Sequence, residues 1–535
     1  MITNTAAMIV LLLPVFAFGL DKEHENHALL DQRFSAPTGK TRSGIMLADF
    51  NNNPVAAPGP AYRSGSFSIF NSAEADTDTG YFPLREGSIA ILPNGEDALA
   101  ARIQTIRKAR ESIRIQSLIF RGDESGLYIS KVLKEKKKEL GSAIDIRIIV
   151  DAISNRDWNT QWMYFDLQQH GITVEGYESF YLQWINEIPI PSDYAKFDML
   201  QVNKRFHDKL WIVDAQTKDA VAIIGGFNIA NEYFCVNPSN ADRTWRDQDI
   251  MVKGEVVEDL VEAFERNFND SLNIKRNRGL ANTNFYWKLP RKAFKTFTRM
   301  KVPFEQDRQI KKRVREYAGR DLSHLRFVKA KCRFLHHRPR HGQRTISTAY
   351  IRMINEARSE ILISNAFFIP SPKMNAALKN AARRGAKTVI ITNSTEANEH
   401  PEIAIVGRGY YHDLLKTNLE GQENSNMEIW EWQGKRADES ERSQGLLHSK
   451  YAVFDRKAGI VGSFNFDPRS DKLNSETVLV FESGELASHL AELFHDKDLS
   501  HSRKITLEEA NGFEDPQDAR EKLQKWYGDI FKELL

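Results

Sequence analysis

The chain has 535 residues, which is too long for one ordinary domain, so we expect two or more. Hydrophobic residues make up 41% of it and charged residues 27%, as in a soluble globular body. The two cysteines, Cys235 and Cys332, exclude a disulfide framework and a thiolate metal site. A single disulfide between them is not excluded, so the number of cysteines does not decide between an oxidising and a reducing compartment.

The net charge of +2 hides a basic block. Residues 275–340 contain 21 lysines and arginines against 4 aspartates and glutamates. Such a block is either a solvated linker or helix face, or a surface for anionic lipid headgroups or nucleic acid. The sequence leaves both interpretations open.

The first 80 residues carry little sign of a fold. Residues 6–20 form an apolar run that is shorter than the roughly 20 residues of a spanning helix. Ala17 and Gly19 have the spacing of a signal-peptidase site, so residues 1–19 are predicted to be an export signal. An uncleaved membrane anchor or a buried segment is the alternative. Residues 20–80, rich in Asn, Ala, Pro, Gly and Ser, are expected to be a loosely ordered extension.

A β-α-β rhythm begins after Tyr81 and returns later in the chain. Helices are predicted at 96–109 and 127–140, and strands at 113–120 and 144–150. The same rhythm recurs as helix 349–357, strand 360–369, helix 374–384 and strand 387–392. The sequence therefore predicts an α/β protein with a long internal repeat.

This repeat divides the chain into parts. We expect a first half at 81–275, a basic connecting segment at 276–335, a second half at 336–510 and a C-terminal helix at 511–535.

Each half contains one copy of the motif H-x-K-x-x-x-x-D. The first copy consists of His207, Lys209 and Asp214, followed by Gly225, Gly226, Phe227 and Asn228. The corresponding residues of the second copy are His448, Lys450, Asp455, Gly462, Ser463, Phe464 and Asn465. The interval from His to Asn is 21 residues in the first copy and 17 in the second, and the difference falls where a hairpin turn is expected. Two such copies are strong evidence for a functional motif.

The spacing within the motif places a histidine and a lysine on one face of a strand. The histidine can attack or protonate a phosphate, and the lysine can neutralise its oxygens. Asp214 and Asp455 lie an odd number of residues from their histidines and would face away from the phosphate. We therefore expect these aspartates to be structural and to hold the hairpin or the contact between the halves.

The two motifs resemble those of the phospholipase D superfamily, over most of residues 85–500. Within it, the chain is most similar to bacterial cardiolipin synthases, particularly their C type. This similarity rests on GSFNFDPRS at 462–470 with LNSE at 473–476, FRGDESG at 120–126 and GGFNIANEYF at 225–234. The resemblance implies two α/β/α sandwich halves related by a pseudo-twofold axis, with one active site at their interface.

The resemblance also implies a set of site residues. Both His-Lys pairs would converge on one phosphate, and Asn228 and Asn465 would donate to its oxygens. Ser463 would assist in the second half, where the first half has Gly226. One histidine would form a phosphohistidine while the other acts as acid and base. By analogy we expect His207 to be the nucleophile and His448 the acid/base; the residues alone do not settle this order.

Each histidine needs an acidic partner that fixes its tautomer. Glu476 lies 11 residues after Asn465 and fits the downstream acidic position of the family. Asp247 is the expected counterpart in the first half, ahead of Asp249 and Glu232.

No metal or other cofactor is expected, because the lysines supply the charge that a metal would otherwise provide. His336, His337 and His341 are not expected to form a metal site, since they lie in the basic block without acidic neighbours. The aromatic segment at 177–190 is expected either to pack in the core or to form a lip that faces acyl chains or the membrane.

The resemblance predicts a phosphatidyltransferase, specifically one that makes cardiolipin from phosphatidylglycerol and a second phospholipid. A hydrolytic phospholipase D that releases phosphatidic acid is the main alternative, because the chemistry is identical up to the phosphohistidine. A nuclease with the basic block on nucleic acid, and a non-catalytic binding protein, are further alternatives. The lipid-branch flanks and the two intact His-Lys pairs disfavour them.

The expected partners are a phospholipid substrate and a membrane surface, and no nucleic acid. The expected location is the bacterial cell envelope, exported or peripheral to the inner membrane. Oligomeric state and any helper protein stay open.

Overall fold

The computed structural model describes residues 66–71, 80–177, 205–277, 306–420 and 426–514, apart from positions 153, 156, 238 and 399, together with residue 522. We call these the described residues, and all of them belong to one structural unit, 66–535. The predicted export signal at 1–19, the aromatic segment from 178 to 190 and most of the predicted C-terminal helix at 511–535 lie outside them.

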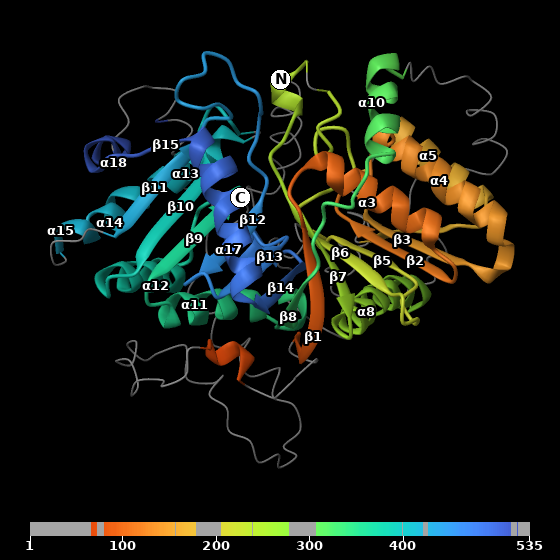
Figure 1. Cartoon of the computed structure of the whole chain (residues 1–535), viewed down its shortest axis with the longest axis horizontal. Coiled ribbons are helices and arrows are strands. Elements are labelled where there is room, and N and C mark those ends of the chain that lie inside the picture. Colours follow the sequence, from red (N-terminus) through yellow and green to blue (C-terminus); the bar gives the residue numbers. More distant parts are fainter. Residues whose placement is uncertain are drawn as a thin grey trace, which may run out of the picture. The chain divides into compact units, whose positions relative to one another are not determined.

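The described strands form one sheet that contains both halves of the chain (Figure 1). Its 15 strands follow the order β15-β11-β10-β9-β12-β13-β14-β8-β1-β7-β6-β5-β2-β3-β4. Their bounds are β1 Tyr81–Leu92, β2 Ser112–Ser117, β3 Asp145–Asp151, β4 Thr173–Tyr177, β5 Leu210–Val213, β6 Val221–Gly225, β7 Asp249–Gly254, β8 Val328–His337, β9 Glu360–Asn365, β10 Lys387–Asn393, β11 Met427–Trp432, β12 Lys450–Phe454, β13 Ala458–Gly462, β14 Glu476–Glu482 and β15 Ser502–Lys504.

The sheet has the internal symmetry that the repeat predicts. β1 and β8 pair antiparallel at its centre, and outward from them each half repeats the same order. This order is β7, β6, β5, β2, β3, β4 in the first half and β14, β13, β12, β9, β10, β11 in the second. The last three strands of each repeated order are parallel, and the short β15 adds antiparallel to β11 at the edge of the second half. The predicted pair of α/β halves is thus confirmed, with the addition that their sheets merge into one through β1 and β8.

Helices cover both faces of this sheet. α8, which follows β7, and α17, which follows β14, pack on one face. Helices α3, α4, α5, α10, α11, α12, α14 and α18 pack on the other. The helix bounds are α3 Gly95–Lys108, α4 Glu124–Leu140, α5 Trp158–Gln169, α8 Val256–Asn277, α10 Arg308–Ala318, α11 Thr345–Glu356, α12 Pro372–Arg383, α13 Pro401–Arg408, α14 Tyr411–Leu415, α15 Thr417–Glu420, α16 Pro468–Lys472, α17 Gly484–Leu493 and α18 Leu507–Glu514. None of the helices that the structure describes is long and apolar enough to cross a membrane.

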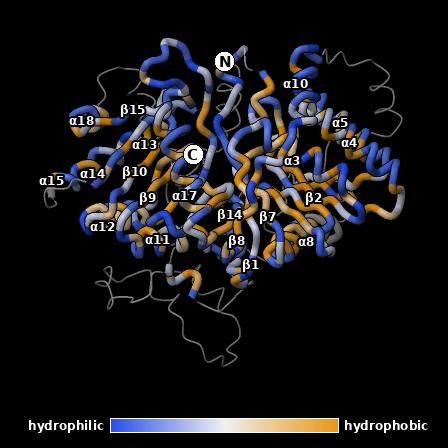
Figure 2. Tube along the Cα trace, in the orientation of Figure 1, coloured by the Kyte–Doolittle hydropathy of each residue, from blue (hydrophilic) through white to orange (hydrophobic). Residues whose placement is uncertain are grey.

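Strands β5, β6, β12 and β13 are almost entirely apolar, because helices cover them on both faces (Figure 2). β6, β12 and β13 are buried at every position. The core beneath α8 and α17 is continuous across the two halves and includes Leu260 of the first and Leu490 of the second. This shared core holds the two motif strands, β5 and β12, within one rigid framework.

The predicted helices and strands of both rhythms are present, with shifted ends. The strands predicted at 113–120 and 360–369 end earlier, at Ser117 and Asn365. After these residues the chain leaves the sheet, and side-chain amides hold it there: Ile119 N donates to Asn228 Oδ1, and Phe367 N donates to Asn365 Oδ1. Local sequence did not reveal this long-range hydrogen bond from Ile119 to Asn228.

Two predicted boundaries were wrong for the residues that the structure describes. Residues 66–71 were assigned to the loose extension, yet Phe67, Ile69 and Phe70 are buried in the core of the second half. The connecting segment predicted at 276–335 contains α10 and most of β8. Exposed Lys329 and Lys331 alternate with buried residues on β8, so the basic composition hid a central strand.

Candidate active site

Both motif histidines lie at the same edge of the sheet, just before β5 and β12. β5 begins at Leu210 and β12 at Lys450. Each histidine segment pairs with a segment of the other half. The backbone N–H of His207 donates to the carbonyl of Ser475 at 3.0 Å, and that of His448 donates to the carbonyl of Arg246 at 2.7 Å. These hydrogen bonds bring the two motifs together where the halves meet.

The acid that follows each of these pairings binds the histidine of the opposite half. Nδ1 of His207 lies 2.9 and 2.8 Å from the two carboxylate oxygens of Glu476. Nδ1 of His448 lies 2.7 Å from Oδ2 of Asp247. A carboxylate beside Nδ1 favours the tautomer that keeps its proton there, which leaves the lone pair on Nε2. The sequence predicted both acids but did not show that each serves the other half.

The causes of the pKa shifts of the two histidines indicate that both motifs belong to one site. His207 is 6% exposed and His448 7% exposed. Burial lowers the pKa of both histidines well below the ordinary value. The positive charges of Lys209 and Lys450 lower the pKa of both histidines further. Each histidine is therefore close enough to the lysine of the other half for its charge to act on the imidazole. The direction of these shifts favours the neutral form of both imidazoles.

The lysines are as deeply buried as the histidines. Burial lowers the pKa of Lys209 to about 8 and that of Lys450 to about 7. Each Nζ donates to the carbonyl of the histidine in its own motif, at 2.9 Å for Lys209. Burial also raises the pKa of Glu476 to about 8 and that of Asp247 to about 6. A bound phosphate would favour the charged form of both lysines, because it brings negative charge into a site with little water.

The two acids have different surroundings. Ser463 Oγ donates to Oε2 of Glu476 at 2.5 Å, and Ser470 Oγ donates to Oε1 at 2.7 Å. Asp247 instead accepts the backbone N–H of its neighbour Gln248 at 2.8 Å. Ser470 was not among the predicted site residues, although it closes the segment GSFNFDPRS that carries the family resemblance.

Gly226, the counterpart of Ser463, leaves room for the acid of the first half. A Cβ at this position would lie 2.2 Å from Oδ1 of Asp247. The glycines just before are also tightly placed: a Cβ at Gly225 would lie 2.2 Å from Oδ1 of Asp249, and one at Gly462 would lie 2.2 Å from the carbonyl of Thr477. The unequal Gly-Gly and Gly-Ser turns thus follow from the different acids that pack against them.

The two motif asparagines are used differently. Asn228 is fully buried, and its amide nitrogen donates to the hydroxyl of Tyr233 at 2.7 Å. This contact uses one of the two amide hydrogens of Asn228, and its role as a phosphate donor stays a prediction. Oδ1 of Asn465 is buried and has no hydrogen-bond partner among the described residues. Asn228 thus uses both its amide oxygen and its amide nitrogen in hydrogen bonds within the protein, whereas the amide oxygen of Asn465 makes none with the described residues.

Two aromatic residues beside His448 were not predicted. The ring of Tyr233 meets the imidazole edge to face at 5.0 Å, and the ring of Trp245 stacks on it at 5.8 Å. No ring contact to His207 is found in the described part of the chain. Tyr233 lies in the segment GGFNIANEYF and Trp245 lies two residues before Asp247, but the type of a single aromatic residue does not indicate a role in a site.

Asp214 and Asp455 face away from the histidines, as their spacing predicts. Each lies in the left-handed region, with φ of 54° and 52°. The carboxylate of Asp214 accepts the backbone N–H groups of residues 110, 111 and 112, and that of Asp455 accepts those of residues 358, 359 and 360. Each aspartate therefore ties its hairpin to the neighbouring strand of its own half.

The weaker candidates for the acidic partner have other roles. Asp249 accepts a hydrogen bond from Arg102 at 2.6 Å, and Glu232 pairs with Arg121 at 2.8 Å. The latter pair joins the segments FRGDESG and GGFNIANEYF, which carry the family resemblance. Neither acid contacts a motif histidine.

His336 and His337 lie at the end of the central strand β8, and His341 lies in the turn after it. His336 is close to Ser475, with 3.3 Å from Nε2 to Oγ, and Nε2 of His337 lies 3.1 Å from the carbonyl of Asp471. Nε2 of His341 lies 3.6 Å from Asp270. Within the described residues, no three His, Cys, Asp or Glu side chains are grouped so as to hold a metal ion.

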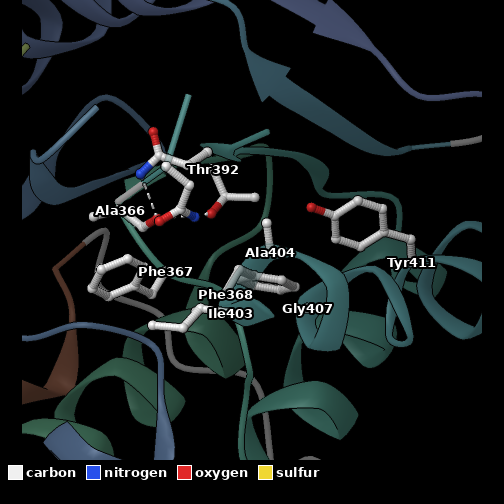
Figure 3. A pocket seen from close by; sticks show the side chains of 10 residues that line it. Ala366, Phe367, Phe368, Thr392, Ile403, Ala404, Gly407 and Tyr411 are labelled. Atoms are coloured by element: carbon white, nitrogen blue, oxygen red, sulfur yellow. Dashed lines mark hydrogen bonds between the residues drawn. The ribbon is translucent and has the colours of Figure 1, made fainter. Parts of the chain in front are cut away.

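A narrow hollow lies beside the second motif, at the ends of β9 and β10 (Figure 3). Phe367 and Phe368, which follow β9, and Ile403 and Ala404 of α13 are among the residues that line it. Asn393, which also lines it, donates to the carbonyl of Leu447 and accepts the N–H of the same residue. This side of the hollow therefore fixes the backbone just before His448.

Comparisons with known proteins agree with this geometry. The sequence model of the family described as "Cardiolipin synthase, PLD-like domain" matches residues 102–271 and 350–498, and each match contains one motif. The major cardiolipin synthase ClsA of Bacillus subtilis is 25% identical over 425 residues, which are 79% of this chain and 71% of that protein. Cardiolipin synthase A of Pseudomonas syringae is 23% identical over 471 residues, 87% of this chain and 80% of that protein.

The fold has a counterpart among solved structures. Phosphatidylserine synthase of Haemophilus influenzae matches 84% of this chain and 95% of its own, with a TM-score of 0.56 and 15% identity. The predicted C type stays a prediction, since the cardiolipin synthases named above do not carry that designation. With a motif in each of the two matched segments, the chain belongs to the cardiolipin synthase, PLD-like domain family and is an enzyme of the phospholipase D type.

Proposed function

We propose that this protein transfers a phosphatidyl group from one phospholipid to a hydroxyl of another through a phosphohistidine, and that the product is cardiolipin. The observation that carries the proposal is the pair His207 and His448, each bound at Nδ1 by an acid of the opposite half and each close to Lys209 and Lys450. The relatives named cardiolipin synthase support a phospholipid substrate.

In the first step, Nε2 of His207 attacks phosphorus, and the bond from phosphorus to the leaving alcohol breaks. His448, protonated in the substrate complex, gives its proton to that alcohol. The lysines offset the charge that builds up on the phosphoryl oxygens. Burial and the lysines lower the pKa of His448 in the free enzyme. The negative charge of a bound phosphate raises this pKa again and so favours the protonated form of His448.

In the second step, His448 takes the proton of the acceptor hydroxyl. The acceptor oxygen attacks phosphorus, and the bond from phosphorus to Nε2 of His207 breaks, which restores the free enzyme. With phosphatidylglycerol as donor and acceptor, the products are cardiolipin and glycerol. Phosphatidylethanolamine is the second donor that we propose, with ethanolamine as the leaving alcohol.

The setting that fits this reaction is a membrane surface at the bacterial cell envelope, where both lipids are present. The relatives named above are bacterial proteins. Hydrolysis to phosphatidic acid is the alternative, in which water takes the place of the acceptor. The burial of the histidines favours transfer over hydrolysis, because a site with little water protects the phosphohistidine.

The test is incubation of the protein with labelled phosphatidylglycerol, with and without phosphatidylethanolamine, followed by chromatography of the lipids. Labelled cardiolipin with release of glycerol or ethanolamine is the expected result. Phosphatidic acid as the sole product at high concentrations of lipid acceptor would contradict transfer. Acid-labile labelling of the protein tests the phosphohistidine, and the variant His207→Asn is its control.

A further inference from the structure

Helix α10 carries a stripe of positive charge on its solvent side. Arg308, Lys311, Lys312 and Arg315 are all exposed and have the spacing i, i+3, i+4 and i+7, which places them on one face. We call these four residues the basic stripe. The buried side of the helix packs on the core of the first half through Val314 and Ala318. In Figure 2 the helix is largely hydrophilic.

The basic stripe is not neutralised by acidic neighbours. The ion pair that it makes within the described residues is that of Lys312 with Glu316, at 3.7 Å with side chains that are 80% and 56% exposed. Such an exposed pair contributes little to stability, roughly 0–1 kcal/mol, so Lys312 can give up Glu316 for another anionic group at little cost. The helix is anchored by other groups, since Asp307 caps its first turn. Its fold therefore does not require the stripe.

α10 lies along the edge of the sheet that contains the active site. At its start, the backbone N–H of Asp307 donates to Glu124 in the first turn of α4, at 2.8 Å. Just past its end, Arg320 lies 2.8 Å from Asp97 in the first turn of α3. Both of these helices begin where β1 and β2 end, and His207 lies at that edge because β5 runs antiparallel to β2.

The helix is also joined to the loop that reaches the second histidine. The hydroxyl of Tyr317 donates to the carbonyl of Cys235 at 3.5 Å, two residues beyond Tyr233, whose ring contacts His448. The basic stripe therefore lies at the edge of the sheet that carries the two histidines, and not at the opposite edge. An exposed row of positive charges beside an active site is suited to a partner that carries many negative charges and also contains the substrate.

We propose that the basic stripe docks the protein on an anionic lipid bilayer, with the active-site edge toward the headgroups. This proposal rests on the proposed function, since it takes the substrate to be a membrane phospholipid. Each Lys or Arg near an anionic surface contributes about 1 kcal/mol, which is roughly fivefold in affinity. The attraction acts over about 10 Å at an ionic strength of 0.1 M.

The test is sedimentation of the full chain with vesicles of phosphatidylcholine alone or mixed with phosphatidylglycerol. The wild type should bind the mixed vesicles more tightly, and added NaCl should weaken the binding. Lys311→Glu/Lys312→Glu/Arg315→Glu should lose at least about tenfold in binding. The matched control Lys108→Glu/Lys138→Glu/Lys457→Glu makes the same change of charge at exposed positions on the opposite edge of the sheet and should bind like the wild type.

Sedimentation needs no catalysis, so its outcome is independent of whether the protein transfers phosphatidyl groups. Thermal unfolding of all three proteins checks that the variants are folded. Equal loss in the stripe variant and the control would overturn the proposal, because net charge alone would then explain binding. Equal binding to both kinds of vesicle would overturn it too. So would stripe-dependent binding of duplex DNA without binding to vesicles, because the stripe would then serve nucleic acid.

Discussion

The two halves present their histidines at equivalent positions of one sheet, but the surroundings of the histidines differ in kind. His207 is held by Glu476, and this carboxylate is itself fixed by the hydroxyls of Ser463 and Ser470. The hydrogen-bond chain on that side fixes the direction of the imidazole. A nucleophile depends on such a fixed direction, because Nε2 must point at phosphorus.

The surroundings of His448 contain rings rather than hydroxyls. Asp247 binds its Nδ1, and the rings of Tyr233 and Trp245 pack against the imidazole. Aromatic faces attract a cation, so they favour the imidazolium form in a site that otherwise opposes it. A general acid needs that form. A duplicated motif therefore does not imply duplicated roles, and the difference supports His207 as nucleophile and His448 as acid/base.

The largest effect should come from the histidines themselves. We expect His207→Asn and His448→Asn each to lower turnover of phosphatidylglycerol by at least about 10³-fold. A substrate with a 4-nitrophenol leaving group needs little acid catalysis, so with this substrate His448→Asn should still form a labelled phosphoprotein, whereas His207→Asn should not. The reverse pattern would exchange the two roles. The measurement is acid-labile labelling of the protein.

The acids should have the next largest effect. Glu476→Gln and Asp247→Asn keep the shape of each side chain but no longer fix the tautomer of the histidine that it binds, and we expect losses of about 10²–10⁴-fold in kcat. Because each acid serves the opposite half, Glu476→Gln should prevent labelling by the 4-nitrophenyl substrate and Asp247→Asn should not. If Asp247→Asn prevented labelling and Glu476→Gln allowed it, the acids would not act through the histidines that they contact.

Exchanging the glycine and the serine tests the unequal turns. Gly226→Ser should lower activity about 10–100-fold, because its Cβ would displace the carboxylate of Asp247. Ser463→Gly should cost less, about tenfold, since it removes one hydrogen bond to Glu476 and leaves that of Ser470. Comparison of kcat for the two variants measures the difference. Equal and small effects would show that the turns do not set the position of the acids.

The alkaline limb of the pH profile separates the two lysines. Burial lowers the pKa of Lys450 to about 7 and that of Lys209 to about 8, so their charge is present below these values and is lost as the pH rises. We expect kcat/KM to fall above about pH 7–8, and the limb of kcat to lie at higher pH because bound phosphate raises the pKa of both lysines. Lys450→Arg keeps its charge at all these pH values, so the limb of kcat/KM should move up toward the pKa of Lys209. An unchanged limb in this variant would exclude Lys450 as its source.

The sequence predicted the repeat and both motifs, because these depend on local spacing and on residue types that are poor core material, whereas the two acids were predicted from the resemblance to the family. It did not show the exchange of acids between halves, which depends on the pairing of residues 205–207 with 475 and of 446–448 with 246. Sequence distance carries no signal of such pairings. The central strand β8 was missed for a related reason, since its exposed lysines resemble a linker.

The smallest effect on catalysis, but a clear effect on stability, is expected for the motif aspartates. Asp214 and Asp455 each accept three backbone N–H groups, and charge-assisted hydrogen bonds of this kind contribute about 1.5–3 kcal/mol. Asp214 is 6% exposed whereas Asp455 is only half-buried, so Asp214→Ala should lower the free energy of unfolding more than Asp455→Ala. Urea unfolding measures both. Activity per folded molecule should stay within about threefold, because neither carboxylate faces the phosphate. If either variant instead kept its stability and lost kcat by the factors expected for the histidines, the aspartate would belong to the catalytic machinery and the strand-alternation argument would fail for that half.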